Sequence, residues 1–451
     1  MSGRTILVDN TCQMKGKNTD KVNKCAKPEP GGALGGCAFD GAQITLIQIS
    51  DALHIAHSPS TCIGCSYNNR GTRSTVGALY RYGITTDLNE MDIIMGSEEK
   101  LIRTIKECTD IFKPKAVFVY STCIADMTGF DLMDVVKKAQ DIVKIPVIPV
   151  DSPGFIGNKN YGNKKAGEAL FRYVIGTMEP EYTTDTDICI IADYNIAGEL
   201  WRILPYFEEL GIRVLSKITG DATYEEVAYA HRSRCNMVVC SRALVTLAKS
   251  LKLKYGTEYF EGSFYGVKET SNALRKIGEI LNIDHLKEKI ECFVQKKEKE
   301  VEQALKFFKR FFKNKRVFIY SGGVKSWSMV MQLEELGFEV IGSGIRKSST
   351  EDIEKLKRHF EGKQKILMEK GDGQLLLDIL EKNKADLFIA GSRNLYVAMK
   401  GQIPYLDVNQ ERIKAYAGYE GMITLAGDIY HTMNSKVFKT VKNNPSFLRL
   451  I

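Results

Sequence analysis

Short runs of consecutive apolar residues recur along this chain, and each is followed by a segment with helical spacing. The runs at 116–120 and 317–320 are continuous rather than alternating in polarity. A strand in which every residue is apolar must be covered on both faces, and parallel sheets flanked by helices provide that cover. The pattern therefore predicts an α/β fold with parallel sheets.

The alternation falls into three series, so we expect three Rossmann-like domains. Expected strands are 115–122, 145–150, 187–193, 212–216, 236–240, 316–320, 338–342, 365–369 and 386–390. Expected helices are 97–112, 128–143, 164–176, 197–210, 224–233, 241–252, 327–336, 350–359 and 374–381. Ligands should bind at the carboxyl ends of the strands, in clefts between domains.

The expected domain boundaries follow from these series. Residues 1–36 form a loop-like N-terminal arm with Gly and Cys, 37–180 the first domain, 181–315 the second, and 316–451 the third domain with the C-terminal segment. The stretch 283–316 is dense in Lys and Glu, which predicts a long exposed helix that bridges two domains. A helix that binds nucleic acid is the alternative, but the interspersed Glu residues disfavour it.

Length, composition and charge narrow the functional classes. The chain has 451 residues, 44% of them hydrophobic, so it can bury a large core. No apolar run approaches the roughly 18–20 residues of a membrane span, and the first residues lack a signal-peptide core, so we expect a cytoplasmic protein. The formal charge of +8 is mild. It suits an anionic ligand or an acidic partner, although an ordinary solvated surface explains it more simply.

Eleven cysteines are present, and disulfides are rare in the reducing cytosol. Cys37 follows a glycine run, Cys62 forms a Cys-x-x-Cys string with Cys65, and Cys123 closes the strand 115–122. A Cys just past a parallel strand points to the ligand-binding edge of the sheet, where thiolates suit iron–sulfur ligation. On spacing alone, buried thiols remain the alternative, and the Cys-x-x-Cys string also suits a redox site or half of a zinc site.

Two further strand ends carry candidate groups. Cys240 ends the expected strand 236–240, where a plain buried Cys is the alternative. The turn 320–327 contains a Gly pair before a helix, which suits an anion, although an ordinary turn would look the same. His54 and His57 are one helical turn apart, and we expect them to form a packing face rather than a metal pair.

Six strings resemble the nitrogenase component 1 family, and within it the α-like subunit of the scaffold that matures the iron–molybdenum cofactor. They begin with Glu-Pro-Gly-Gly-Ala-Leu-Gly-Gly-Cys-Ala-Phe-Asp-Gly-Ala-Gln, and their positions are 29–43, 69–74, 151–160, 260–266, 322–328 and 406–412. The resemblance extends from residue 29 to about residue 421, which is nearly the whole chain.

The resemblance implies a homologous β-like subunit and an α₂β₂ heterotetramer, with three Rossmann-like domains in each subunit. It implies that Cys37, Cys62 and Cys123 ligate a 4Fe–4S cluster at the αβ interface, and that the partner supplies the fourth ligand. It also implies that Cys240 anchors the iron–sulfur precursor, which acquires molybdenum and homocitrate. Further implied partners are the reductase Fe protein, a precursor donor and apo-nitrogenase as recipient; neither nucleic acid nor a membrane is implied.

Departures from the catalytic α subunit point to a scaffold. That subunit has a second cofactor ligand, a His, in the segment matching 406–421, where this chain has Asn409 and no His between His359 and His431. It also has a His over the reacting face, in the segment matching 151–162, where this chain has none. A cofactor precursor held by one thiolate can be released, and a missing His removes a proton donor for dinitrogen reduction.

Basic residues complete the expected site. Gly322, Gly323 and Lys325 match a turn in which the catalytic subunit has a Gly pair and an Arg. Lys325, Arg70 and Arg73 would attract an anionic precursor, although the two arginines suit a structural role equally well. The alternative to a scaffold is a catalytic α-like subunit of a nitrogenase-like reductase. A simple iron–sulfur electron-transfer module explains neither Cys240 nor the length of the chain.

Overall fold

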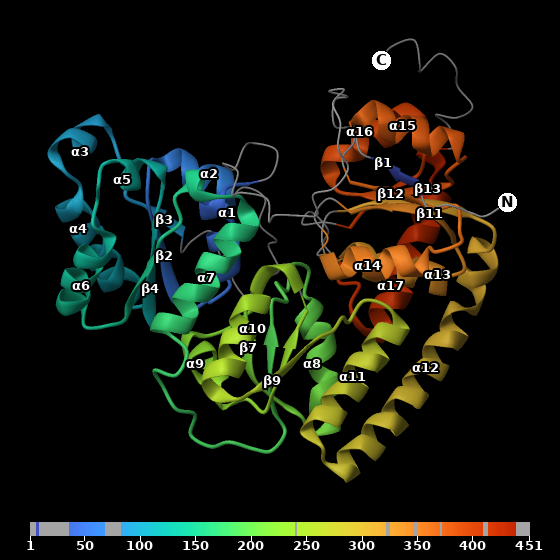
Figure 1. The fold of residues 1–451 in the computed structure, drawn as a ribbon, viewed down its shortest axis with the longest axis horizontal. Coiled ribbons are helices and arrows are strands. Elements are labelled where there is room, and N and C mark those ends of the chain that lie inside the picture. The colour runs from blue at the N-terminus through green and yellow to red at the C-terminus, as the bar shows by residue number, and fades with distance from the viewer. Residues whose placement is uncertain are drawn as a thin grey trace, which may run out of the picture. The chain divides into compact units, whose positions relative to one another are not determined.

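The computed structural model describes residues 6–8, 36–67, 83–239, 241–321, 325–345, 348, 350–369, 372–408 and 414–438. The described strands form three sheets, and all their strand pairs are parallel. Figure 1 shows helices on both sides of the sheets. The α/β architecture with parallel sheets is therefore confirmed, and its cause is the continuous apolar strands.

The first sheet has the strand order β3-β2-β4-β5. These strands are β3 (Gly83–Thr85), β2 (Ala52–His57), β4 (Ala116–Ser121) and β5 (Val147–Val150). Alternate strand residues face opposite ways. One face packs against α4 (Glu98–Phe112) and α6 (Leu132–Val143), and the other against α1 (Ala38–Leu46) and α7 (Lys159–Tyr173). Short helices α2 (Ser60–Tyr67), α3 (Glu90–Met95) and α5 (Cys123–Met127) complete this part.

The second sheet has the order β7-β6-β8-β9 and shares the core that α1 and α7 cover. Its strands are β6 (Asp187–Ile191), β7 (Arg213–Ile218), β8 (Cys235–Val238) and β9 (Glu258–Glu261). Its helices are α8 (Glu199–Leu210), α9 (Tyr224–Ala228) and α10 (Ser241–Tyr255).

The third sheet has six strands in the order β1-β12-β11-β10-β13-β14. They are β1 (Ile6–Val8), β10 (Arg316–Tyr320), β11 (Glu339–Gly344), β12 (Ile366–Met368), β13 (Leu387–Ala390) and β14 (Tyr405–Asp407). Helices α15 (Gly373–Lys382) and α16 (Leu395–Gly401) pack on one face, and Figure 1 shows α13 (Lys325–Glu335), α14 (Thr350–His359) and α17 (Gly418–Met433) on the other.

The N-terminal arm differs from the loop that the sequence predicts. Ile6–Val8 forms β1, which pairs in parallel with Ile366–Met368 at the edge of the third sheet. Three apolar residues are enough for an edge strand when the sheet already exists. The other residues of the 1–35 segment lie outside the described residues.

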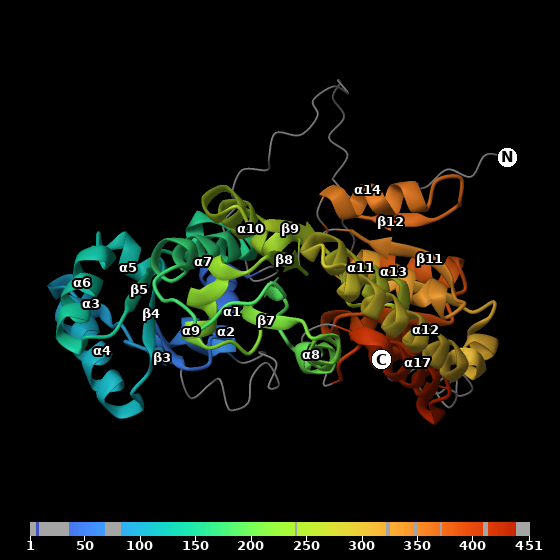
Figure 2. The ribbon, with the colours of Figure 1, turned by 90° about the horizontal axis from the view of Figure 1, so that it is seen from below.

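The chain divides into two compact units, residues 19–261 and residues 262–451 with 1–18. The second unit contains α11 (Val267–Leu281) and α12 (Asp284–Phe312), which run side by side and next to α17 (Figure 2). The long helix predicted at 283–316 is confirmed as α12, but it is not exposed on every side, and its role as a bridge between domains stays a prediction. One face of α12 is buried within this unit through Leu286, Ile290, Phe293, Val294, Val301, Leu305 and Phe312. The expected boundaries at 180 and 315 stay predictions.

Local signals explain most helix ends. The helix expected at 128–143 begins only at Leu132, because the Asp131 side chain accepts hydrogen bonds from the backbone N–H groups of Met133 and Asp134. Such a cap satisfies N–H groups that the first turn leaves unpaired. No helix in the described ranges is both long and apolar enough to cross a membrane.

Candidate functional site

Several predicted site residues follow the strands at which a sheet changes winding direction. In the first sheet, β2 lies between β3 and β4, so the connections after β2 and β4 leave in opposite directions, and parallel sheets bind ligands at the carboxyl ends of such strands. Cys62 follows β2 and Cys123 follows β4. The corresponding pairs are β6 and β8 in the second sheet and β10 and β13 in the third. Position 240 follows β8, and positions 322–323 follow β10.

The thiols of Cys37 and Cys123 converge on Gly154. The Gly154 backbone N–H donates a hydrogen bond to Cys123 Sγ at 3.1 Å. A Cβ atom on Gly154 would lie 2.9 Å from Cys123 Sγ, 3.1 Å from Cys37 Cβ and 3.4 Å from Cys37 Sγ. Both cysteines are only partly buried. Two thiols from residues 86 positions apart in sequence thus share one partly exposed position, beside a backbone donor.

Close contact between α1 and α7 fixes Cys37. Cys37 caps the N-terminus of α1 and forms an antiparallel bridge with Asn158, which caps α7. A Cβ on Gly41 would overlap the carbonyl oxygen of Lys159, and a Cβ on Gly162 would overlap that of Ala38. The two backbones therefore touch, and only glycine permits this.

Cys62 lies at the same edge of the sheet. It is in the first turn of α2, and its backbone N–H donates to the Pro59 carbonyl at 3.2 Å. The preceding strand pairs His57 with Ser121, and the Thr122 hydroxyl donates to the His57 carbonyl at 2.7 Å. The segments that lead to Cys62 and to Cys123 are thus tied together where they leave the sheet. Cys62 is also partly buried.

Electrostatics keep the Cys37 thiol protonated before any metal binds. Burial raises the pKa of Cys37 above its ordinary value, and the negative charge of Asp40 adds to this effect. The backbone N–H groups of Asp40 and Phe39 oppose it. Cysteine ligates iron as the thiolate, so a cluster that binds here must displace this proton.

The partly buried thiols and the backbone donor suit an iron–sulfur cluster. Among the described residues, no three His, Cys, Asp or Glu side chains are grouped to hold one metal ion. The ligand sulfurs of a cubane cluster lie about 6–7 Å apart and so need not be grouped in this way. Partly exposed thiols beside a backbone N–H are typical of cluster sites, where hydrogen bonds to sulfur tune the reduction potential.

The other described cysteines do not lie at the carboxyl edge of the first sheet. Burial raises the pKa of Cys189 and of Cys235 to about 12, so both are neutral thiols. Burial also raises the pKa of Cys108, while Cys292 is exposed on α12.

Several predicted site residues lie outside the described residues: Arg70, Arg73, Cys240, Gly322, Gly323 and Asn409. Lys325 is the first residue of α13, and its side chain is not described. The elements around these positions do match the expectation. Position 240 stands between β8 and α10, and positions 322–324 stand between β10 and α13.

The histidine pair is not on a helix. His54 and His57 belong to β2, and both are buried. His54 hydrogen-bonds with the Tyr120 hydroxyl at 2.8 Å, and His57 with the hydroxyls of Thr86 and Ser97 at 3.0 and 2.9 Å. Burial lowers the pKa of each to about 4, so both are neutral. The spacing of three residues was interpreted as one helical turn. That interpretation was wrong, because both residues lie on a strand.

Sequence reasoning missed Gly154. The string 151–160 contributes to the family resemblance, and 151–162 was examined for a His, yet the Pro-Gly pair at 153–154 comes just after β5. A Pro-Gly pair at a strand end indicates a turn in which backbone N–H groups can approach a ligand. That signal would have placed a donor at this edge of the sheet.

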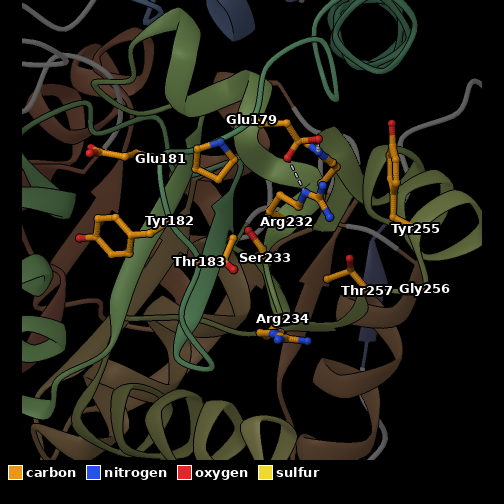
Figure 3. Close-up of a pocket in the computed structure, with 12 residues that line it drawn as sticks. Glu179, Glu181, Tyr182, Thr183, Arg232, Ser233, Arg234, Tyr255, Gly256 and Thr257 are labelled. Atoms are coloured by element: carbon orange, nitrogen blue, oxygen red, sulfur yellow. Dashed lines mark hydrogen bonds and ion pairs between the residues drawn. The ribbon is translucent and has the colours of Figure 1, made fainter.

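A hollow of about 610 Å³ lies at the amino edge of the second sheet, where β6, β8 and β9 begin (Figure 3). Its cationic groups are already paired. Glu179 accepts from Arg232 at 2.5 Å and lies 3.1 Å from His231 Nε2, and Arg234 contacts Asp185 at 3.1 Å. The amino ends of parallel strands rarely bind ligands. The switch point of the first sheet is therefore the stronger candidate.

Comparisons with known proteins place this geometry in context. The family described as nitrogenase component 1 type oxidoreductase matches residues 37–434. The chain is 47% identical to the nitrogenase iron–molybdenum cofactor biosynthesis protein NifE of Rippkaea orientalis, over 95% of this chain and 90% of the relative. It is 46% identical to NifE of a Nostoc species (97% and 92% covered) and 43% identical to NifE of Klebsiella pneumoniae (97% and 98%).

Solved structures agree with the fold. The structure titled nitrogenase Cp1 at pH 6.5 superposes with a TM-score of 0.82, at 23% identity over 94% of this chain and 92% of that chain. The structure titled nitrogenase Cp1 at pH 5 gives a TM-score of 0.81 at 24% identity, over 94% and 91%. These two likenesses concern the fold alone.

Proposed function

The chain belongs to the nitrogenase component 1 family, and on that premise we propose that it is a cofactor-assembly scaffold rather than a nitrogenase. Its NifE relatives are named for iron–molybdenum cofactor biosynthesis. In this proposal the chain binds an iron–sulfur precursor, holds it while molybdenum and homocitrate are added, and releases it to apo-nitrogenase in the cytoplasm.

The observation that carries the proposal is the convergence of Cys37 and Cys123 on Gly154, at the switch point that Cys62 also follows. Cys37, Cys62 and Cys123 would hold a 4Fe–4S cluster. When bound, such a cluster supplies one-electron transfer. The Gly154 N–H would donate to a ligand sulfur, as it does to Cys123 Sγ here. The α1–α7 contact would keep Cys37 in place.

The precursor is the cargo. Its proposed binding groups follow strands of the second and third sheets, together with two arginines from the sequence between α2 and β3. Cys240 would ligate one terminal iron from the loop between β8 and α10. Gly322, Gly323 and Lys325, after β10, and Arg70 and Arg73 would hold the anionic remainder through backbone N–H groups and positive charge. Such attraction is screened in a solvated site, which suits a cargo that must leave. Asn409 leaves the far end of the cargo without a second protein ligand.

A partner is part of the proposal because three thiolates leave one cluster position unfilled. Exposed apolar side chains also call for a partner: on α3, Met91, Ile94 and Met95 are 63%, 73% and 76% exposed. Exposed apolar patches of this kind mark interaction surfaces. We propose a β-like subunit of the NifN type in an α₂β₂ heterotetramer. The Fe protein as reductase, a precursor donor and apo-nitrogenase are the transient partners.

The test is maturation of apo-nitrogenase by the purified complex. We expect the wild-type complex to activate apo-nitrogenase while reducing dinitrogen poorly itself, because it lacks the second ligand and a proton donor. Asn409→His should slow transfer by at least about tenfold, since an added ligand bond is worth more than 1.4 kcal/mol. Asn409→Gln is the matched control and should transfer at the wild-type rate. Efficient dinitrogen reduction without transfer would support the reductase alternative instead.

A further inference from the structure

The C-terminal end of α12 presents an aromatic cluster at the surface. Phe307, Phe308 and Phe311 pack against Tyr430 of α17, with ring centroids 5.3, 5.9 and 4.8 Å from the Tyr430 ring. All three contacts are edge-to-face. Phe307 remains 58% exposed, so the cluster is held rigidly by two helices but is covered on one side only.

A cationic stripe runs beside this cluster. Residues 303–315 contain five Lys or Arg and no Asp or Glu. Lys309 pairs with Glu302, and Lys315 lies 3.7 Å from Asp386. Lys306, Arg310 and Lys313 are exposed and form no ion pair within the described part of the chain. Their spacing of four and three residues places them on one face of the helix.

The N-terminal half of α12 is different. There Lys287 pairs with Asp284 at 3.2 Å, and Lys297 contacts Glu300 and Glu420 at 3.8 and 2.8 Å. Acidic residues are thus interspersed among the lysines of this half, whereas none occurs in 303–315. Lys289, Lys296 and Lys299 of this half also form no ion pair among the described residues, so the difference lies in the local acidic residues rather than in ion pairing. We call Lys306, Phe307, Phe308, Arg310, Phe311, Lys313 and Tyr430 the α12 terminal face.

We propose that the α12 terminal face docks an acidic, amphipathic helix of a partner protein. Lys306 to Lys313 spans about 10 Å along the helix, the length of two helical turns, so it matches carboxylates spaced four and three residues apart. Exposed aromatic side chains with an Arg at their edge are typical anchors of protein interfaces. A lipid surface is disfavoured because Phe308 and Phe311 are half-buried against Tyr430 and cannot insert.

The probe for the test is a synthetic helical peptide with a Glu stripe beside a Leu stripe, and its matched control has Gln in place of Glu. Binding to the full chain is measured by fluorescence anisotropy. We expect the Glu peptide to bind at least about tenfold more tightly than the Gln peptide, and to lose about tenfold in affinity between low and high salt. Phe307→Ala should weaken the binding without altering the salt dependence.

Charge reversal gives the decisive comparison. Lys306→Glu, Arg310→Glu and Lys313→Glu together should abolish binding of the Glu peptide. The matched control reverses Lys289, Lys296 and Lys299, which are exposed on the same helix, and should leave the affinity within about twofold. Circular dichroism and thermal melting verify that both variants fold.

Four results would overturn the proposal. The first is equal binding of the two peptides, and the second is a loss of affinity in the control triple variant as large as the loss in the test variant. The third is tighter binding of anionic vesicles or single-stranded RNA to the face than of the Glu peptide. The fourth is a loss of self-association, or of co-purification with the β-like subunit, in the test variant but not in the control variant, which would make the face a contact between subunits. The assay involves no metal, so its outcome is independent of the proposed cofactor function.

Discussion

Gly154 is the residue whose lack of a side chain matters most for the candidate site. A methyl group there would press on Cys123 Sγ and Cys37 Cβ at 2.9 and 3.1 Å. Gly154→Ala should therefore separate the thiols, lower the iron bound at the interface site, and destabilise the fold by about 1–3 kcal/mol. Gly64→Ala is the control, because nothing lies within 4 Å of a Cβ at that position of α2. Equal iron content in both variants would show that Gly154 does not shape the site.

Two buried histidines give the fold an acid sensitivity that can be measured. The pKa of His54 and of His57 is about 4 in the folded state, against 6.5 when exposed. Because the folded pKa is lowered, the unfolded chain binds more protons between these values. The free energy of unfolding should therefore be highest above pH 6.5 and fall toward pH 4, by up to about 3 kcal/mol for each histidine.

Denaturant unfolding at a series of pH values measures this loss. In His54→Gln the amide can replace the imidazole hydrogen bonds but does not titrate, so the fall in stability should be shallower than in the wild type. An unchanged slope would mean that other groups cause the acid sensitivity.

At the scale of elements, the α1–α7 pair is the scaffold of the site. Gly162→Ala would drive a methyl group into the Ala38 carbonyl, which is backbone and cannot move aside. We expect a destabilisation of about 4 kcal/mol or more, or failure to fold. Gly167→Ala, on the same helix, meets the Leu244 Cδ2 methyl at 2.9 Å and Leu247 Cβ at 3.5 Å, both side-chain atoms, and should change the stability by about 1 kcal/mol or less. Thermal melts of the two variants measure this contrast, and similar melting temperatures would contradict it.

Elements with a strong local signal could be predicted from the sequence, and elements defined by distant contacts could not. The helix 350–359 was predicted with its observed ends, because polar residues surround a clear apolar stripe. In α12, dense Lys and Glu residues hid the stripe that includes Leu286, Ile290 and Phe293. Strand β1 depends on β12, whose residues lie about 360 positions further along the chain. No local pattern carries that information.

At the scale of the whole molecule, continuous apolar strands were enough to predict parallel sheets, and strand order then placed Cys62 and Cys123 at one sheet edge. Convergence with Cys37 could not be predicted from spacing. It depends on two helices whose backbones touch and on the turn at Gly154. The resemblance to a known family supplied the ligand set, and the described structure supplies a physical reason why two of its members lie together.

In the proposed function this chain carries two separate metal-cluster sites, one for a resident cluster and one for cargo. Iron quantification with EPR spectroscopy on the co-expressed complex, for Cys123→Ala and Cys240→Ala, tests it most directly. We predict that Cys240→Ala loses the precursor iron and keeps the interface-cluster signal, and that Cys123→Ala loses the interface-cluster signal. Cys108→Ala serves as the control and should keep both. Full precursor loading in Cys240→Ala, or an intact interface cluster in Cys123→Ala, would show that the two sites are not separate.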